Sequence, residues 1–257
     1  MNQTLGFVSL TGETEKSNLP LNLAACLAAQ GKRTLLVDLT CPAPALDILG
    51  GCAEEVVYTA SDVVSERVAL SRAVLPLPVK KSREQTGDVL FLLPSSPAEH
   101  LSEDACKRLL RILRTDTVYD VVLVWFSYHN VTREGLDGLF LLTDGDEVSL
   151  RAVEAQRDRL EADAFLLTGF DTDWENQRYM PPLLDTVERV ALSLLGIVPR
   201  MPVGLSGMIM DGSFKRAGAY TRAVQNVAAR ILGKDTPLLQ GVSLMGIGRR
   251  RYLTKGQ

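Results

Sequence analysis

Short, unbroken apolar runs recur along the chain, and segments with the apolar spacing of a helix lie between them. The runs are continuous rather than alternating, which is typical of strands buried on both faces of a sheet. Parallel strands of this kind need right-handed crossovers. The sequence therefore predicts an α/β fold with a doubly wound, mostly parallel sheet flanked by helices. The predicted strands are Thr4–Leu10, Thr34–Asp38, Leu90–Leu93, Val121–Trp125, Leu139–Leu142, Phe165–Leu167 and Leu195–Val198. The predicted helices are Leu19–Gln30, Glu103–Arg114, Val148–Glu161, Leu183–Leu194 and Tyr220–Leu232.

Charge and cysteine content exclude several classes of protein. The 28 Lys and Arg residues against 31 Asp and Glu leave a net charge of -3, which gives no overall attraction to nucleic acid. The four cysteines form no C-x-x-C pair, so we expect reduced thiols without a structural zinc or a disulfide framework. The first residues, MNQTLGFVSLTGE, do not resemble a signal peptide, and no window reaches the ~18 apolar residues of a membrane span. We therefore expect a cytoplasmic protein.

The turn after the first predicted strand has some of the residues of a phosphate-binding loop. Such a loop uses glycines so that backbone N–H groups approach the phosphates, a Lys for the outer phosphates and a Ser or Thr hydroxyl for Mg²⁺. Lys16 and Ser17 stand at the right place, at the start of a helix. Of the glycines only Gly12 is present, and Glu15 directly precedes the lysine. A solvated turn with a Glu15–Lys16 charge pair is the open alternative.

Many further matches to one family follow in a single order along the chain. The family turn K-G-G-V-G-K-T corresponds to Thr11–Ser17, and the family segment G-K-[RK]-V-L-L-I-D to Gly31–Asp38. Other matching segments are Asn22–Ala24, Leu46–Gly50, Val57–Val63, Leu92–Ser96, Tyr119–Val124, Leu195–Pro199 and Ala223–Leu238. Over about residues 1–240 the chain thus resembles the MinD/ParA family of deviant P-loop ATPases, and its MinD branch most closely. The resemblance implies a P-loop type of sheet, nucleotide-gated dimers and a role in placing a cellular machine such as the division septum.

The departures from the family fall at its chemical positions. Thr11 stands where the family has the signature Lys that reaches the partner's nucleotide, and Glu13 and Glu15 replace two glycines. Thr40 stands where the family has the Asp that positions the attacking water, and Trp125 where an Asp ends the Walker B strand. The adenine-reading segment V-N-R corresponds to Leu167–Gly169. The remnants of the nucleotide site are Gly12, Lys16, Ser17 and Asp38.

These departures predict that the site no longer turns over ATP. Losing a cation that offsets transition-state charge costs orders of magnitude in rate. Thr40 cannot orient water as a carboxylate does, and the Trp125 ring is expected to fill the site. A carboxylate about 4 Å from a phosphate costs roughly 4 kcal/mol at an effective dielectric of 20, and about 1 kcal/mol when hydrated. We expect no catalytic residue, no metal and no cofactor; binding of ATP with Mg²⁺ is the alternative.

Two functional hypotheses from different classes follow. The first is a catalytically degenerate scaffold or regulator in the positioning of a division or envelope machine, with a protein partner or a MinD-like subunit in a homodimer or heterodimer. The second is a slow ATPase switch that dimerises with ATP. A DNA-partition protein of the ParA type is weaker, because no basic face is evident outside the tail, so we expect no nucleic-acid partner.

The organisation predicted is one MinD-like P-loop α/β domain over residues 1–235 and a tail over 236–257. The tail joins apolar residues to Arg249–Arg251, the chemistry of segments that bind anionic membranes. Its three glycines disfavour a helix, so a disordered or partner-bound tail is the alternative. With membrane contact, the protein would be peripheral at the inner face of the plasma membrane.

The remaining polar residues have ordinary explanations. His100 and His129 lack ligand spacing and are expected at the surface, and no spacing suggests a Cys-His or Ser-His-Asp arrangement. The acidic turn Asp144–Glu147 is expected to cap a helix rather than hold a metal.

Met201–Met210 is rich in Met and Gly, so it is a candidate for a flexible contact surface or a plain core loop.

Overall fold

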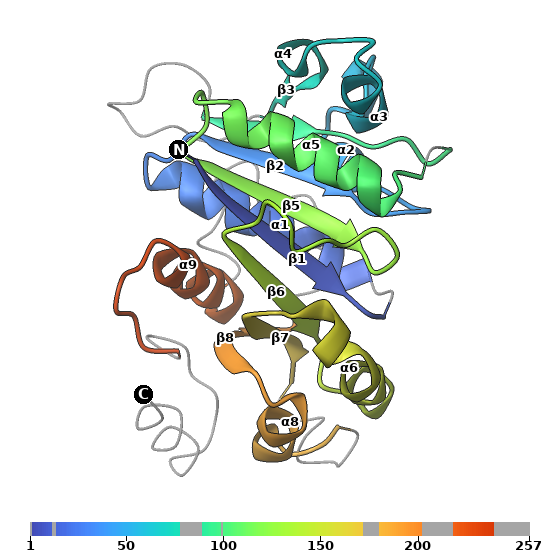
Figure 1. The fold of residues 1–257 in the computed structure, drawn as a ribbon. Helices are drawn as coiled ribbons and strands as arrows, with labels where there is room; N and C mark the ends of the chain where they lie inside the picture. The colour runs from blue at the N-terminus through green and yellow to red at the C-terminus, as the bar shows by residue number, and fades with distance from the viewer. Residues whose placement is uncertain are drawn as a thin grey trace.

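Eight strands form one sheet in the order β3-β4-β2-β5-β1-β6-β7-β8, as Figure 1 shows. The computed structural model describes residues 2–11, 14–77, 89–98, 100–171, 180–201 and 218–238, with the backbone alone for 14–17. The strands are β1 (Gln3–Ser9), β2 (Thr34–Leu39), β3 (Leu75–Pro76), β4 (Leu90–Leu93), β5 (Val121–Ser127), β6 (Gly138–Thr143), β7 (Ala164–Phe170) and β8 (Ser193–Pro199). Only β3 among them is antiparallel, and it lies at the edge of the sheet. The doubly wound α/β prediction is confirmed.

The helices cover both faces of this sheet. They are α1 (Thr14–Ala29), α2 (Leu46–Leu49), the 3-10 turn η1 (Ala53–Glu55), α3 (Ala60–Val64), α4 (Leu70–Ala73), α5 (Glu103–Thr115), α6 (Glu147–Leu160), α8 (Leu183–Val190) and α9 (Ala219–Ile231). In Figure 1, α5 lies in front of the sheet and α1 behind it. α9 packs against both α1 and β8. Its close approach to the sheet requires Gly196, because a Cβ there would lie 2.5 Å from Val227 Cγ2.

The core explains why the apolar runs form central strands. Every residue of β2 and β4 is buried, and β1 is buried over Thr4–Val8. Strands covered on both faces in this way have no solvent side, so their sequences carry no alternation. Among the described residues, none of the helices has the length and apolar character needed to cross a bilayer.

The parallel strands fix where a site can form. Their carboxyl ends meet at one edge of the sheet, on the right of Figure 1, and open α/β sheets bind ligands at that edge. We call this the carboxyl edge; it is made by the segments that follow Ser9, Leu39, Leu93, Ser127 and Thr143. The predicted tail begins at residue 236, after α9, and its first described residues pack against the domain. Thr236 and Leu238 are buried.

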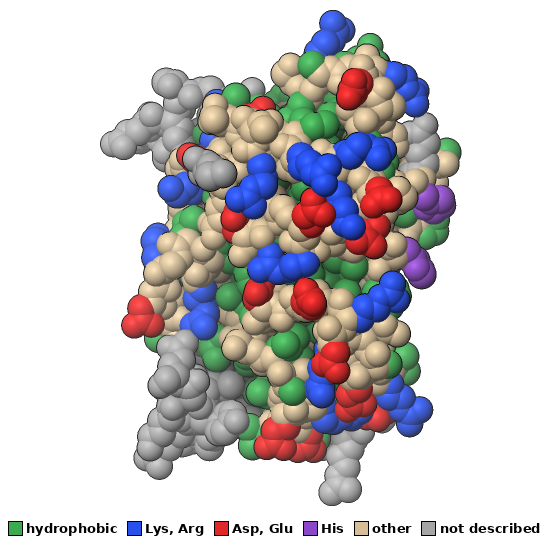
Figure 2. Space-filling model, viewed as in Figure 1, with side chains coloured by type: hydrophobic (Ala, Val, Ile, Leu, Met, Phe, Trp, Pro, Cys, Tyr) green, Lys and Arg blue, Asp and Glu red, His purple; other side chains and the backbone are tan. Residues whose placement is uncertain are grey.

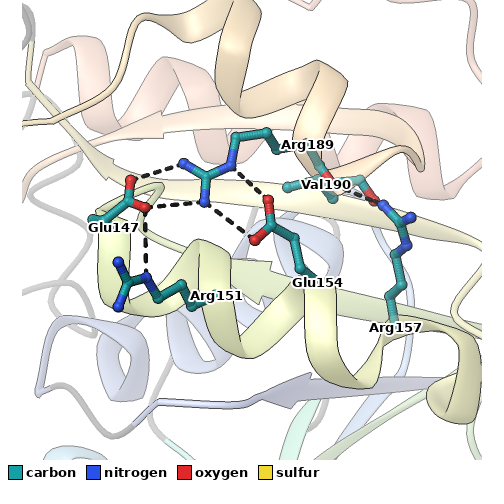
Figure 3. A network of polar contacts seen from close by, with 6 residues as sticks. All are labelled: Glu147, Arg151, Glu154, Arg157, Arg189 and Val190. Atoms are coloured by element: carbon teal, nitrogen blue, oxygen red, sulfur yellow. Dashed lines mark hydrogen bonds and ion pairs between the residues drawn. The ribbon is translucent and has the colours of Figure 1, made fainter.

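A charged network joins α6 to α8 (Figure 3). Arg189 donates to Glu154 at 2.6 and 3.2 Å and to Glu147 at 2.8 and 3.2 Å. Arg157 donates to the carbonyl oxygens of Arg189 at 2.8 Å and Val190 at 3.3 Å, at the end of α8. Two forked contacts from one guanidinium fix the orientation of both helices.

The network predicts a pH-dependent contribution to stability. Hydrogen bonds from Arg189 lower the pKa of both Glu147 and Glu154. A lowered carboxyl pKa contributes stability above the unfolded pKa of about 4.3, and this contribution is lost as pH falls through the folded pKa. Arg189→Ala is therefore expected to lower the Tm at pH 7, with the difference from wild type narrowing below about pH 4. Thermal unfolding from pH 7 to 3 measures this. Arg151→Ala, which removes only a 3.7 Å contact to Glu147, is the control. A Tm difference between Arg189→Ala and wild type that stays the same from pH 7 to 3 contradicts a role for the ionised Glu147 and Glu154.

Candidate functional site

The four predicted remnants of a nucleotide site are described to different extents. Gly12 lies outside the described residues. Lys16 and Ser17 belong to the first turn of α1, and their side chains lie outside the description. β1 ends at Ser9 and α1 begins at Thr14, so the strand–turn–helix context of a phosphate loop is present. Asp38, in β2, is described in full.

Both oxygens of the Asp38 carboxylate accept hydrogen bonds from the protein itself. Asp38 is only 1% exposed. Oδ1 accepts from the Thr40 N–H at 3.0 Å and from the Thr40 hydroxyl at 2.5 Å. Oδ2 accepts from the N–H groups of Ala45 at 3.2 Å and Leu46 at 3.1 Å, at the start of α2. Burial raises the pKa of Asp38, while these four hydrogen bonds act to lower it. A carboxylate has about four acceptor positions, so this one is fully engaged.

Trp125 belongs to an aromatic row in the core. It stands beside Phe7 on one side and Asp38 on the other in the register of the sheet, so the three side chains share a face. The indole is 4% exposed and stacks on Phe7, with ring centroids 5.3 Å apart and planes 19° apart. Phe7 also packs against Phe140, with ring centroids 5.3 Å apart. The strand position where the family has an acid is therefore occupied by a packed apolar ring.

Thr11 contacts α6 of the same chain. Its hydroxyl lies 3.0 Å from the Ser149 hydroxyl, and its carbonyl oxygen accepts from the Ser9 hydroxyl at 2.7 Å. Ser149 lies in the first turn of α6, where its N–H donates to the Asp146 carboxylate at 2.6 Å. The acidic turn therefore caps α6, as predicted for this segment. Thr11, at the position of the family's signature Lys, therefore contacts residues of its own chain.

The segment that replaces the adenine-reading motif has no side chain suited to reading a base edge. Leu167 is fully buried in β7, and the Thr168 hydroxyl donates to the Thr143 carbonyl at 3.4 Å. Gly169 offers only backbone groups. Of the Met-rich segment, Met201 is buried, while 202–210 lie outside the described residues.

One pair of residues at the carboxyl edge was missed by sequence reasoning. The Cys41 thiol contacts His100 Nδ1, and His100 Nε2 lies 3.8 Å from the sulfur. The Ser127 hydroxyl accepts from the Cys41 N–H at 2.6 Å and donates to its carbonyl at 2.9 Å. Cys41 and His100 are far apart in sequence, in segments after β2 and β4. Only the pairing of β2 with β4 in the sheet indicates that the two residues meet.

Comparison with known proteins gives one consistent set of relatives. No family model matches the chain. It is 24% identical to the septum site-determining protein MinD of Synechocystis over 98% of this chain and 99% of that one. It is 23% identical to MinD of Bacillus subtilis over 93% and 92%.

Solved structures with the same fold include members of both branches. A MinC:MinD cell division complex of Aquifex aeolicus aligns with a TM-score of 0.76 at 19% identity, over 95% of this chain and all of that one. A ParA family ATPase of Chlorobium tepidum aligns with a TM-score of 0.68 at 19% identity, over 89% and 99%. Along almost its whole length the chain is similar in sequence to MinD proteins, and it has the fold of MinD and ParA family ATPases.

Proposed function

We propose that this chain is a MinD-like protein that does not hydrolyse ATP and that acts as a scaffold or regulator in positioning a division or envelope machine. The observation that carries the proposal is the Asp38 carboxylate, whose two oxygens accept four hydrogen bonds from Thr40, Ala45 and Leu46. A group engaged in this way has no acceptor position left for a metal-bound water.

The described residues around Asp38 do not fit Mg²⁺ and ATP. Mg²⁺ is held by carboxylate and water oxygens together with phosphate oxygens. Thr40 donates its hydroxyl to Asp38, and Trp125 is stacked on Phe7. Neither can position a metal-bound or attacking water.

The relatives support the proposed role and the proposed partner. The MinD proteins of Synechocystis and Bacillus subtilis are septum site-determining proteins, and the Aquifex aeolicus protein is in complex with MinC. We propose a protein partner for this chain as well, either a MinC-like protein or a MinD-like subunit. Such a partner needs the surface of the family fold, not its hydrolysis chemistry.

Titration with ATP and Mg²⁺ tests the loss of nucleotide chemistry. We expect no heat of binding at micromolar ATP and no phosphate release, because the Asp38 carboxylate is paired with Thr40, Ala45 and Leu46. The ParA family ATPase of Chlorobium tepidum is the control. Glu13→Gly with Glu15→Gly is expected to raise ATP affinity, because it removes carboxylates from the phosphate loop. Micromolar binding by the wild-type chain contradicts the proposal and favours the slow ATPase switch.

Membrane contact by the tail is a second part of this proposal. The tail lies outside the described residues beyond Leu238, and its apolar and basic composition is what supports the idea. We expect the full chain to sediment with vesicles rich in anionic lipid. A chain ending at Leu238 is expected to stay in the supernatant. Equal sedimentation of the two removes the membrane part and leaves the rest of the proposal unchanged.

A further inference from the structure

Cys41 and His100 bring two metal-binding side chains together at the carboxyl edge. The sulfur contacts Nδ1 of the imidazole. Cys41 is half-buried and His100 is exposed, so solvent can reach the pair. In Figure 2 the histidine side chains, in purple, lie along the right-hand rim, the side toward which the parallel strands of Figure 1 point. Thiolate and imidazole are the ligands that Zn²⁺ prefers in proteins.

The backbone that carries the thiol is held from both sides. Ser127, at the end of β5, bonds both the N–H and the carbonyl of Cys41. Asn130 donates to the Leu39 carbonyl at 2.9 Å, two residues earlier. Thr40, next to the cysteine, is bonded to the buried Asp38. Metal sites depend on outer contacts of this type, because these contacts hold the ligands in place.

The electrostatics of the pair favour a cation over a free thiolate. Burial, together with the negative charge of Asp38, raises the pKa of Cys41. The same negative charge favours a divalent cation at the sulfur, which displaces the proton.

One chain supplies only half of a structural zinc site. Such sites use four protein ligands in a tetrahedron. Within the described ranges, His, Cys, Asp and Glu side chains nowhere gather in a group of three or more that could hold a metal. A second copy of the pair would complete the set of four.

Some large apolar side chains are also exposed to solvent in the described part of the chain. Five large apolar side chains stand out as exposed in the described part of the chain: Ile48, Val57, Val118, Val148 and Leu184. Ile48 and Val57 lie between β2 and β3, Val148 lies in the first turn of α6 after β6, and Leu184 lies at the start of α8 after β7.

We propose that Cys41 and His100 from two copies of this chain bind one Zn²⁺ in a Cys₂His₂ site that bridges a dimer at the carboxyl edge. Two thiols each release a proton to solvent, and two thiolates and two neutral imidazole nitrogens replace waters of the hydrated ion; no electron is transferred. The bridge goes beyond the proposed function and needs no nucleotide.

Titration of the full chain with Zn²⁺ in the absence of nucleotide tests the bridge. After treatment with a chelator, we expect a monomer by light scattering. We expect a dimer as Zn²⁺ reaches one ion per two chains, and a return to monomer with excess chelator. Co²⁺ in place of Zn²⁺ is expected to show thiolate-to-metal charge-transfer absorption. A monomer that binds one ion, or a mass that does not respond to Zn²⁺, overturns the proposal.

Substitutions identify the ligands. Cys41→Ser and His100→Ala are each expected to abolish the Zn²⁺-dependent dimer, with circular dichroism and Tm as checks of folding. His129→Ala is the matched control, because His129 is also exposed after β5 and packs edge-on against Tyr128. Dimers that persist in the two ligand variants, or that are lost in His129→Ala alone, overturn the assignment. An outcome of the ATP titration does not bear on this result, so the two proposals fail independently.

Discussion

Trp125→Ala is expected to lower the free energy of unfolding by about 3–5 kcal/mol, the usual cost of truncating a large buried aromatic side chain. The indole is 4% exposed and stacks on Phe7 in the middle of the sheet. Its removal leaves a cavity lined by groups that central strands hold in place. Urea denaturation followed by circular dichroism measures the loss as a shift in midpoint at constant slope.

The conservative variant separates packing from any nucleotide role. Trp125→Phe keeps a ring against Phe7 and is expected to cost much less than the alanine variant. Had the indole been a mobile cover over a working site, alanine would leave the midpoint unchanged and increase ATP binding. That result would contradict the assignment of Trp125 to the core.

Asp38→Ala is expected to destabilise the chain by about 3–9 kcal/mol, because it leaves three backbone N–H groups without their acceptor at about 1–3 kcal/mol each. These are the N–H groups of Thr40, Ala45 and Leu46. Denaturation gives the total, and hydrogen exchange at the Leu46 amide reports on the start of α2. Exchange there is expected to accelerate far more than in the central strands.

Two variants serve as controls for the aspartate. Asp38→Asn keeps one acceptor oxygen, so its loss is expected to be intermediate. Glu54→Ala removes an exposed acid from η1, in the same segment, and is expected to change nothing measurable. If Asp38 served only a bound metal, the alanine variant would keep the wild-type midpoint in nucleotide-free buffer.

The strands and long helices were predictable because burial on both faces leaves a direct mark on the sequence. Leu90–Leu93 is predicted with the boundaries that the structure has. The helix predicted over Leu183–Leu194 ends at Val190, where Ala191 adopts a left-handed conformation with φ of 53°. Glycine is the usual residue there, so its absence concealed the end of the helix.

Between β2 and β4 the sequence was less informative. The segments α2, α3 and α4 have four or five residues each, too few to show a helical period. Thr59 and Asp62 form a capping box at the start of α3, and this was the one local signal that could have found it.

The candidate site was predictable as a set of departures from a family, not as a geometry. The sequence indicates that Thr11, Thr40 and Trp125 lack the family's chemistry. It does not indicate that Asp38 caps α2, because that depends on the path of the chain between Thr40 and Leu46. Nor does it bring Cys41 to His100, since their contact depends on the order of strands in the sheet.

The cap on α2 has a consequence for how such a protein can be controlled. The segment that begins α2 is held by the chain's own Asp38 carboxylate. If the chain does not hydrolyse ATP, as proposed above, no nucleotide cycle switches it between two states. Its activity in the cell would then follow how much of it is made, how fast it is removed and how much partner is present.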